Sequence, residues 1–244
     1  MNIFGSVRRR RKAPKLGDGF RISMKSPCVP SGFDARDHRF LALQPIFNRQ
    51  RKIFGYEALS RSGWDNWFTG NPDTATQTLV GDWMLDEIHA LAAGSTSFLN
   101  CTREALLGGL LTLLPASTVL ELLETVEPDK EVLIACRRMK ALGYQIALDD
   151  FQHSEKMNDL IELADYVKVD FRVSDKDERK EIIHRFKRGS TILVAEKIET
   201  SEELEMASGE GFRLFQGYYL GRPRVFSKRK GSAIGVARYA AWED

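Results

Sequence analysis

Two adjacent carboxylates, Asp149 and Asp150, follow a short apolar run, and their spacing is the first in this chain to suggest chemistry. The next apolar run carries Lys168 and ends in a further carboxylate, Asp170. Neighbouring carboxylates repel each other unless a cation or a shared proton relieves the repulsion. A helix N-cap would account for one of the two aspartates but hardly for both. The pair therefore predicts a functional site at the end of a strand.

Strand-like segments that mostly alternate with helical segments would position these residues. The first two, 41–47 and 52–59, are joined by a link that suits antiparallel strands but is too short for a parallel crossover. Such alternation predicts either a closed barrel or an open doubly wound sheet. The further expected strands are 97–100, 118–124, 146–148, 166–170, 191–197 and 213–219, and the expected helices are 74–93, 102–113, 128–142, 157–164, 175–188 and 201–208.

A polar residue recurs at or near the end of most of these strands, and this recurrence favours the barrel, in which all strand ends converge on one mouth. Apart from one lysine, the set offers oxygen ligands without histidine or cysteine, which suits Mg²⁺ or Mn²⁺ and disfavours structural zinc. Its carboxylates are too many for one Mg²⁺, so we expect two cations with Asp149 as the bridge, an arrangement suited to in-line hydrolysis of a phosphate ester. The residues are Glu57, Asn100, Glu124, Asp149, Asp150, Lys168, Glu196 and Gln216.

Residue chemistry alone leaves other readings of this set open. Lys168 could orient a water molecule or stabilise charge on a phosphate, but it could also form only a salt bridge with Asp150 or Asp170. Acids at successive strand ends beside a lysine also describe enolase-type proton abstraction, and an isolated strand lysine could serve a Schiff-base aldolase.

Charge is unevenly distributed along the 244 residues. Residues 1–39 hold ten Lys/Arg against three Asp/Glu, whereas residues 40–220 hold twenty against twenty-nine. We expect a basic, disordered tail over 1–37, a barrel over 38–226 and a short basic tail over 227–244. The run from Arg8 to Lys12 could contact anionic lipid or nucleic acid, although a solvated tail is the simpler interpretation. The absence of a signal peptide, of a membrane span and of a disulfide pattern predicts a cytoplasmic protein.

Eight short segments follow one another in a distinctive order: QPI (44–46), GYEALSR (55–61), FLN (98–100), LELLE (120–124), ALDDF (147–151), VKVD (167–170), AEKIE (195–199) and FQGYYLGRP (215–223). Together they resemble the EAL domain, a family of bacterial cyclic-di-GMP phosphodiesterases, over about residues 40–226. The resemblance implies an α/β fold, a TIM-like (β/α)8 barrel with an antiparallel first strand. It also implies hydrolysis of cyclic-di-GMP to linear pGpG with Mg²⁺ or Mn²⁺. The phrases ADYVKVD and LVAEKIET are most similar to the EAL half of proteins that pair this domain with an HDOD domain.

The resemblance also implies a role for each matching position. Metal ligands would be Glu57, Asn100, Glu124, Asp149, Asp150 and Glu196. Catalysis would involve Glu57, Glu196 as a possible general base, and Lys168 as the residue that holds the attacking water. Substrate would be contacted by Gln44, Arg61, Asp170, Glu199 and Gln216, and Glu127 would anchor the loop after Asp150.

The loop after the two aspartates departs from the family pattern. Active members continue with DDFGTG or DDFGSG, whereas residues 151–154 here read Phe-Gln-His-Ser and lack both glycines. Because glycines permit backbone angles that other residues avoid, this loop must take a different path. The pattern fits either a slow phosphodiesterase or a domain that binds cyclic-di-GMP, or a protein partner, without cutting. A homodimer is expected from the resemblance alone.

Overall fold

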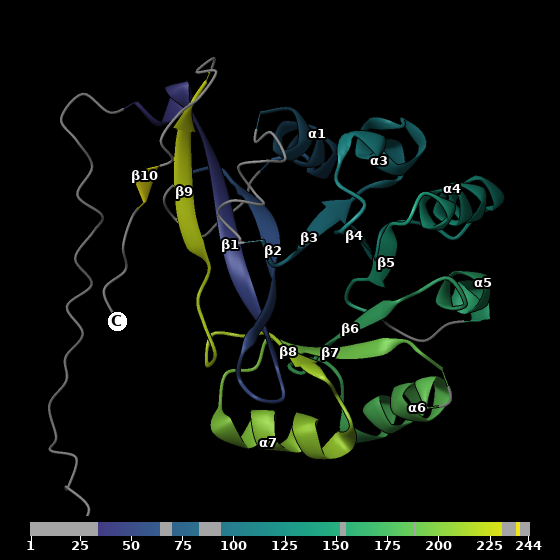
Figure 1. Ribbon diagram of the computed structural model, residues 1–244. Coiled ribbons are helices and arrows are strands. Elements are labelled where there is room, and N and C mark those ends of the chain that lie inside the picture. Colours follow the sequence, from purple (N-terminus) through teal and green to yellow (C-terminus); the bar gives the residue numbers. More distant parts are fainter. Residues whose placement is uncertain are drawn as a thin grey trace, which may run out of the picture.

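The computed structural model describes residues 34–63, 70–82, 94–151, 155–187, 189–230 and 238–239. Its strands follow the order β10-β9-β1-β2-β3-β4-β5-β6-β7-β8, and β1 also pairs with β8, so that eight strands close into a barrel (Figure 1). The barrel strands are β1 His38–Asn48, β2 Ile53–Arg61, β3 Thr96–Cys101, β4 Thr118–Leu122, β5 Gln145–Leu148, β6 Tyr166–Asp170, β7 Ile192–Glu196 and β8 Leu214–Phe215.

The first strand runs against its neighbours. β1 is antiparallel to both β2 and β8, whereas each pair from β2–β3 to β7–β8 is parallel. The turn between β1 and β2 is held by the side chain of Asn48, which accepts hydrogen bonds from the backbone N–H groups of Gln50 and Lys52. The predicted TIM-like barrel with an antiparallel first strand is therefore confirmed.

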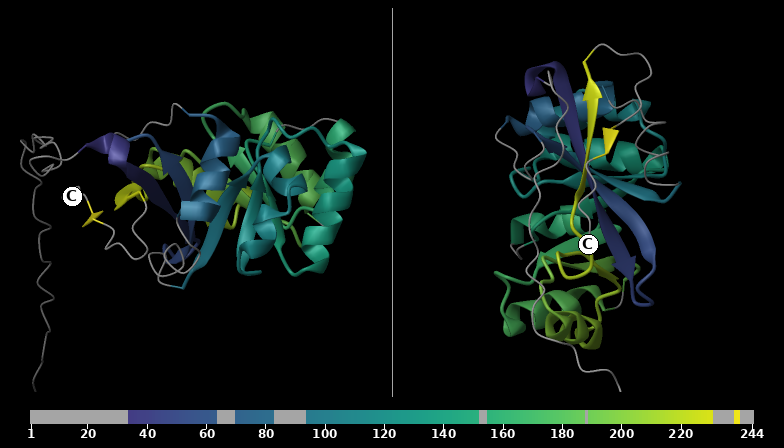
Figure 2. Two further views of the ribbon diagram at one scale, coloured as in Figure 1. Left: turned by 90° about the horizontal axis from the view of Figure 1, so that it is seen from above. Right: turned by 90° about the vertical axis from the view of Figure 1, so that its left-hand side faces the viewer.

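Helices lie outside the parallel strands and cover them from solvent (Figures 1 and 2). Several begin at capping side chains, as at Thr200, which accepts a hydrogen bond from the backbone N–H of Glu203 while the Glu203 carboxylate bonds back to the Thr200 N–H. The helices are α1 Pro72–Asp82, α3 Arg103–Leu107, α4 Lys130–Ala141, α5 Asn158–Ile161, α6 Lys176–Phe186 and α7 Ser201–Glu210, with short 3₁₀ turns at Ala35–Asp37, Leu110–Leu113 and Glu155–Met157. Within the described residues, none of the helices has the length and apolar character needed to cross a membrane.

Several predicted elements differ from the structure in their extent, or are only partly described. The helix expected over 102–113 is broken into α3 and a 3₁₀ turn, because Gly109 between them adopts a left-handed φ of 75°. The last strand, expected over 213–219, is only Leu214–Phe215, since the chain turns away after Gln216. The helix expected over 74–93 is α1 as far as Asp82, and its remainder lies outside the described residues.

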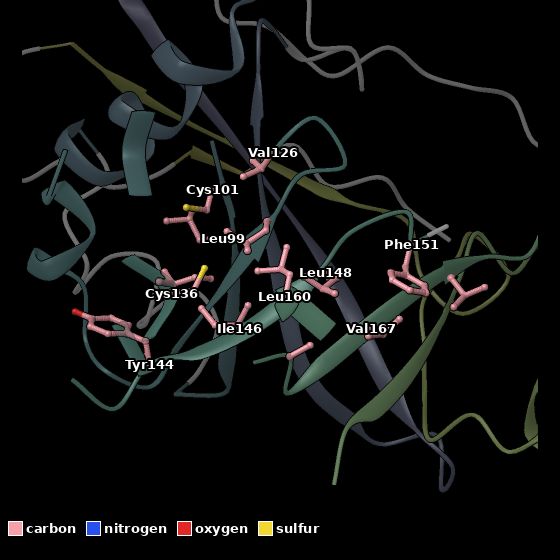
Figure 3. Packing of buried hydrophobic residues seen from close by; sticks show 14 of the residues in the cluster. Leu99, Cys101, Val126, Cys136, Tyr144, Ile146, Leu148, Phe151, Leu160 and Val167 are labelled. Carbon is pink, nitrogen blue, oxygen red and sulfur yellow. The ribbon is translucent and has the colours of Figure 1, made fainter. Parts of the chain in front are cut away.

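The apolar core has two main layers. The larger one lies between the sheet and the helices and includes two buried free cysteines, Cys101 and Cys136 (Figure 3). The smaller one fills the inside of the barrel with one side chain from most strands: Ile46, Phe98, Val119, Ala147, Tyr166, Val194 and Leu214. The inner layer forms the floor on which the polar residues described below rest.

Beyond the barrel, the sheet continues on the far side of β1 with β9 (Arg224–Arg229) and β10 (Arg238–Tyr239) (Figure 2). The domain boundary expected at residue 226 falls inside β9, which pairs with β1 along its length. Val225 of β9 is buried against Phe40 and Ala42, so apolar packing fixes the strand there. The basic run of the N-terminal tail lies outside the described residues.

Candidate functional site

A layer of polar side chains lies directly above the apolar floor of the barrel. Because side chains alternate along a strand, a residue two positions after an inward-facing residue also faces inward. In six strands, the inward-facing apolar residue is followed two positions later by a polar one. The pairs are Phe98 and Asn100, Val119 and Glu121, Ala147 and Asp149, Tyr166 and Lys168, Val194 and Glu196, and Leu214 and Gln216. In the antiparallel β1 the order is reversed, and Gln44 stands two positions before Ile46. The polar layer therefore lies at the carboxyl end of the parallel strands, where barrel enzymes hold their sites.

Lys168 is the centre of this layer, and its side chain is only 1% exposed. Its Nζ donates hydrogen bonds to Glu57 Oε2 at 3.3 Å and to Glu121 Oε1. Its Nζ also lies 3.3 Å from Asp149 Oδ1 and 2.8 Å from Glu196 Oε1. One buried ammonium thus faces four carboxylates, a ratio that leaves the cluster short of positive charge.

The shortage of positive charge is reflected in the ionisation of the cluster. Burial and the charge of Glu57 raise the pKa of Glu121 well above its usual value. Burial likewise raises the pKa of Glu196 to about 8, although Lys168 acts in the opposite sense. For Asp149, burial works against ionisation, but Lys168 and a hydrogen bond with Glu121 lower the pKa overall. Without a further cation, the cluster is therefore expected to hold protons near neutral pH.

The donor set fits a hard divalent cation. Asn100 Oδ1 and Gln216 Oε1 are buried and have no hydrogen-bond partner in the part of the chain that the structure describes. The amide of Gln216 is oriented by its other end, since Nε2 donates to Glu57 Oε2 at 2.7 Å. Buried oxygens without partners and carboxylates that share a proton are both relieved by a bound cation.

A second acidic group lies at the edge of the layer. Glu124, Asp149 and Asp150 each bring one carboxylate oxygen within 4.8 Å of the others, so the group could hold an ion. Asp149 belongs to both groups, as expected of a bridging residue. Lys197 Nζ lies 3.2 Å from Asp150 Oδ1 and 2.5 Å from Asp170 Oδ2. Asp170 also accepts a hydrogen bond from the backbone N–H of Arg172.

Glu121 is the residue of the site that the sequence analysis missed. The strand expected over 118–124 was taken to end in Glu124, but β4 ends at Leu122 and Glu124 is exposed two positions later. Glu121 is fully buried and lies in register with Asn100 on the neighbouring strand. Because side chains alternate along a strand, Glu121, two positions after the inward-facing Val119, is expected to face inward as well. Glu124 stands an odd number of positions after Val119 and does not fit this alternation. The structure nevertheless places both residues at the site.

Of the predicted substrate contacts, Gln44 and Gln216 belong to the polar layer itself, and the others lie beside it. Gln44 is opposite Glu57 in the β1–β2 ladder, and Arg61 follows Glu57 by four positions on the same face of β2. The Arg61 guanidinium donates to the backbone carbonyl of Ser60 at 3.0 Å. Burial lowers the pKa of Arg61 although Glu57 opposes the shift. Glu199 is half-exposed and forms a 3.1 Å ion pair with Arg172.

The anchoring role predicted for Glu127 depends on the loop after Phe151. Glu127 is exposed in the turn that precedes α4. Residues 152–154, which Glu127 would anchor and which include His153, lie outside the described residues. The anchoring role of Glu127 therefore stays a prediction.

Comparison with known proteins identifies the family. Residues 97–223 match the EAL domain. The chain is 35% identical over 212 residues to YuxH of Bacillus subtilis (84% of this chain, 51% of that protein) and 33% identical over 196 residues to the cyclic di-GMP phosphodiesterase CdgJ of Vibrio cholerae (78% and 45%). It thus spans about half the length of the curated relatives it matches. The fold is similar to that of B. subtilis YkuI, solved with its EAL domain in complex with substrate c-di-GMP and calcium, with a TM-score of 0.63, 23% identity and coverage of 78% and 56%. This chain belongs to the EAL domain family.

Proposed function

We propose that this chain is an EAL-type phosphodiesterase that hydrolyses cyclic-di-GMP to linear pGpG with Mg²⁺ or Mn²⁺. The observation that carries the proposal is the buried layer of carboxylate and amide oxygens around Lys168, in a chain of the EAL family. The relative CdgJ is named a cyclic di-GMP phosphodiesterase, and the YkuI structure holds c-di-GMP with calcium. We further propose that the chain is most similar to the EAL half of EAL–HDOD proteins and that it is located in the cytoplasm.

The cations would be held by the two acidic groups that share Asp149. Bound divalent cations would supply an activated water and stabilise charge on the scissile phosphate. Glu121, fully buried beside Lys168, joins the set predicted from sequence. The ligands would be Glu57, Asn100, Glu121, Asp149 and Glu196 on the inner side, and Glu124 and Asp150 at the rim.

The remaining residues would bind and orient the substrate. Lys168 would hold the attacking water beside the carboxylates, because its contacts with Glu57 and Glu196 fix the position of its ammonium group. Glu196, 2.8 Å from that ammonium, would take up the proton that the water releases. Arg61 and Gln44 would contact a phosphate from the β1–β2 side of the mouth, and Gln216, Asp170 and Glu199 from the β6–β8 side.

Calorimetric titration with cyclic-di-GMP in Ca²⁺, followed by a turnover assay in Mg²⁺ and in Mn²⁺, separates binding from cleavage. Binding with release of pGpG is the expected result. Glu57→Gln should abolish turnover, because it removes one carboxylate of the layer at almost constant volume. Glu205→Gln, a change on the exposed side of α7, should leave turnover unchanged. A chain that binds no cyclic-di-GMP under any of these conditions contradicts the proposal.

The alternative is a domain that binds cyclic-di-GMP without cutting it. Two observations favour it: the loss of both glycines after Phe151, and the occupation of Asp150 by Lys197. This function predicts calorimetric binding in Ca²⁺ and no pGpG in Mg²⁺ or Mn²⁺, with Glu57→Gln changing affinity only. A role as a protein-interaction module, with or without homodimerisation, would follow if the nucleotide did not bind.

A further inference from the structure

The ion pairs at the edge of the polar layer join three residues, Lys197, Asp150 and Asp170, which we call the Lys197 bridge. The Lys197 ammonium lies 3.2 and 3.4 Å from the two carboxylate oxygens of Asp150 and 2.5 Å from Asp170 Oδ2. The Asp150 carboxylate is one of the three that together could hold a metal ion. A protein cation thus already occupies one of the three carboxylates, that of Asp150, which would bind the outer divalent ion.

We propose that Lys197 is a built-in cation that competes with the outer divalent ion at Asp150, so that the chain binds one ion tightly and the second only when Lys197 is displaced. This inference rests on the proposed function, because it assumes that divalent cations bind at the two acidic groups. It assigns to Lys197 the control of metal stoichiometry, a role separate from that of Lys168 at the centre of the layer.

Backbone geometry supports a specific role for the bridge. In the described residues, three positions other than glycine have a positive φ: Arg51, Asp150 and Lys197. Arg51 lies in the tight turn between β1 and β2, whereas the other two are partners in the bridge, at φ 39° and 56°. Side chains other than glycine rarely adopt this conformation, and it persists only where surrounding contacts enforce it. The bridge holds together two strained positions from the ends of β5 and β7.

Exposure explains why the competition would be reversible. The Lys197 side chain is 45% exposed and Asp150 is 39% exposed, so the ammonium can turn into solvent when an ion takes its place. Asp170, at 8% exposed, is the more buried partner and would keep its hydrogen bond to the Arg172 N–H after Lys197 leaves. Lys168, by contrast, is 1% exposed among four carboxylates and has no comparable path to solvent.

Counting bound Mn²⁺ tests the inference without reference to activity. The paramagnetic resonance of free Mn²⁺ is measured as the ion is added to the whole chain and to Lys197→Gly. We expect the wild type to bind one ion tightly, and Lys197→Gly to bind a second ion roughly 10- to 100-fold more tightly than the wild type does, because a competing unit charge a few ångströms away has gone. Asp150→Asn introduced into Lys197→Gly should remove this gain and leave the first ion in place.

Two variants separate charge from backbone strain. Lys197→Gln removes the charge and keeps a residue with a β-carbon at φ 56°, so it should gain the second ion as Lys197→Gly does. Arg51→Gly relaxes a similar φ of 56° far from the acidic groups and should bind Mn²⁺ as the wild type does. If the wild type and Lys197→Gly bind two ions with equal affinity, the inference is wrong while the metal site stands. If none of the proteins binds Mn²⁺, the proposed function itself fails.

Discussion

Replacing Lys168 by methionine would leave a group of buried carboxylates without their counter-charge. In the wild type, the ammonium contacts Glu57, Glu121, Asp149 and Glu196 within the barrel. Methionine has a similar length and flexibility, so the loss of packing should be small. Breaking a buried ion pair by removing one partner costs about 3–5 kcal/mol, and we expect the metal-free variant to lose that much at pH 8.

The same variant should lose much less stability in acid. A carboxyl group whose pKa is higher in the folded state than in the unfolded state opposes folding only above the unfolded value, and this cost grows as the pH rises toward the folded value. Glu196 has a folded pKa raised from 4.5 to about 8 by burial. Lys168 holds that pKa down, so its removal makes Glu196 contribute a further loss only from about pH 8 upward. Lys168 also lowers the pKa of Asp149, so its removal raises that pKa and adds a loss that begins at lower pH. The difference between variant and wild type should therefore widen from pH 5 to pH 8.

Urea unfolding at the two pH values, with chelator present, measures both quantities. Lys140→Met is the matched control, because Lys140 pairs with the single carboxylate of Asp165 at 2.6 Å, and both side chains are about one-third exposed. Such a pair contributes about 0–1 kcal/mol. Equal losses for Lys168→Met at pH 5 and pH 8 would show that packing, not charge, is responsible. A loss no larger than that of Lys140→Met would contradict the account of the cluster.

Three further outcomes are expected. Mn²⁺ should raise the unfolding temperature more at pH 8 than at pH 5.5, because Glu121 and Glu196, whose pKa values burial raises, must give up protons to bind the ion; equal shifts would contradict this. Gly217→Ala should cost about 1–3 kcal/mol in urea unfolding and weaken binding of cyclic-di-GMP, since a β-carbon would lie 2.1 Å from the Ile198 carbonyl oxygen and push Gln216 away. Thr200→Ala should cost about 1 kcal/mol of stability by removing the N-cap of α7, with Thr200→Ser close to wild type.

Much of the polar layer could be predicted from the sequence because the alternation of side chains along each strand places most of its residues. Polar residues at or near the ends of apolar runs indicated a barrel mouth, and Asn100, Asp149, Lys168, Glu196 and Gln216 indeed lie there together. Each strand from β3 to β8 contributes to the apolar floor first and to the polar layer two residues later. This regularity follows from the period of a strand, and a sequence displays it directly.

The features that the sequence analysis missed, the inward-facing Glu121 and the strand β9, depend on where strands begin and end. The segment 118–124 contains two glutamates, and the end of β4 at Leu122 places Glu121 within the strand and Glu124 beyond it. A strand boundary is set by pairing with neighbours, here by Leu122 opposite Cys101 and Leu148, and such long-range contacts leave no local pattern. The same holds for β9, whose residues read as a basic tail until they are placed beside β1.

The two lysines of the site have opposite consequences for cation binding. Lys168 cannot leave, so any ion that binds must share the carboxylates with it, and protons must be released to make room. Lys197 can leave, so the outer ion needs only to outcompete an exposed ammonium. An ion that binds the folded chain alone stabilises it in proportion to the logarithm of its concentration relative to its Kd. Both ions should therefore stabilise the fold, but the inner ion should also couple to pH, whereas the outer ion should couple to the position of Lys197.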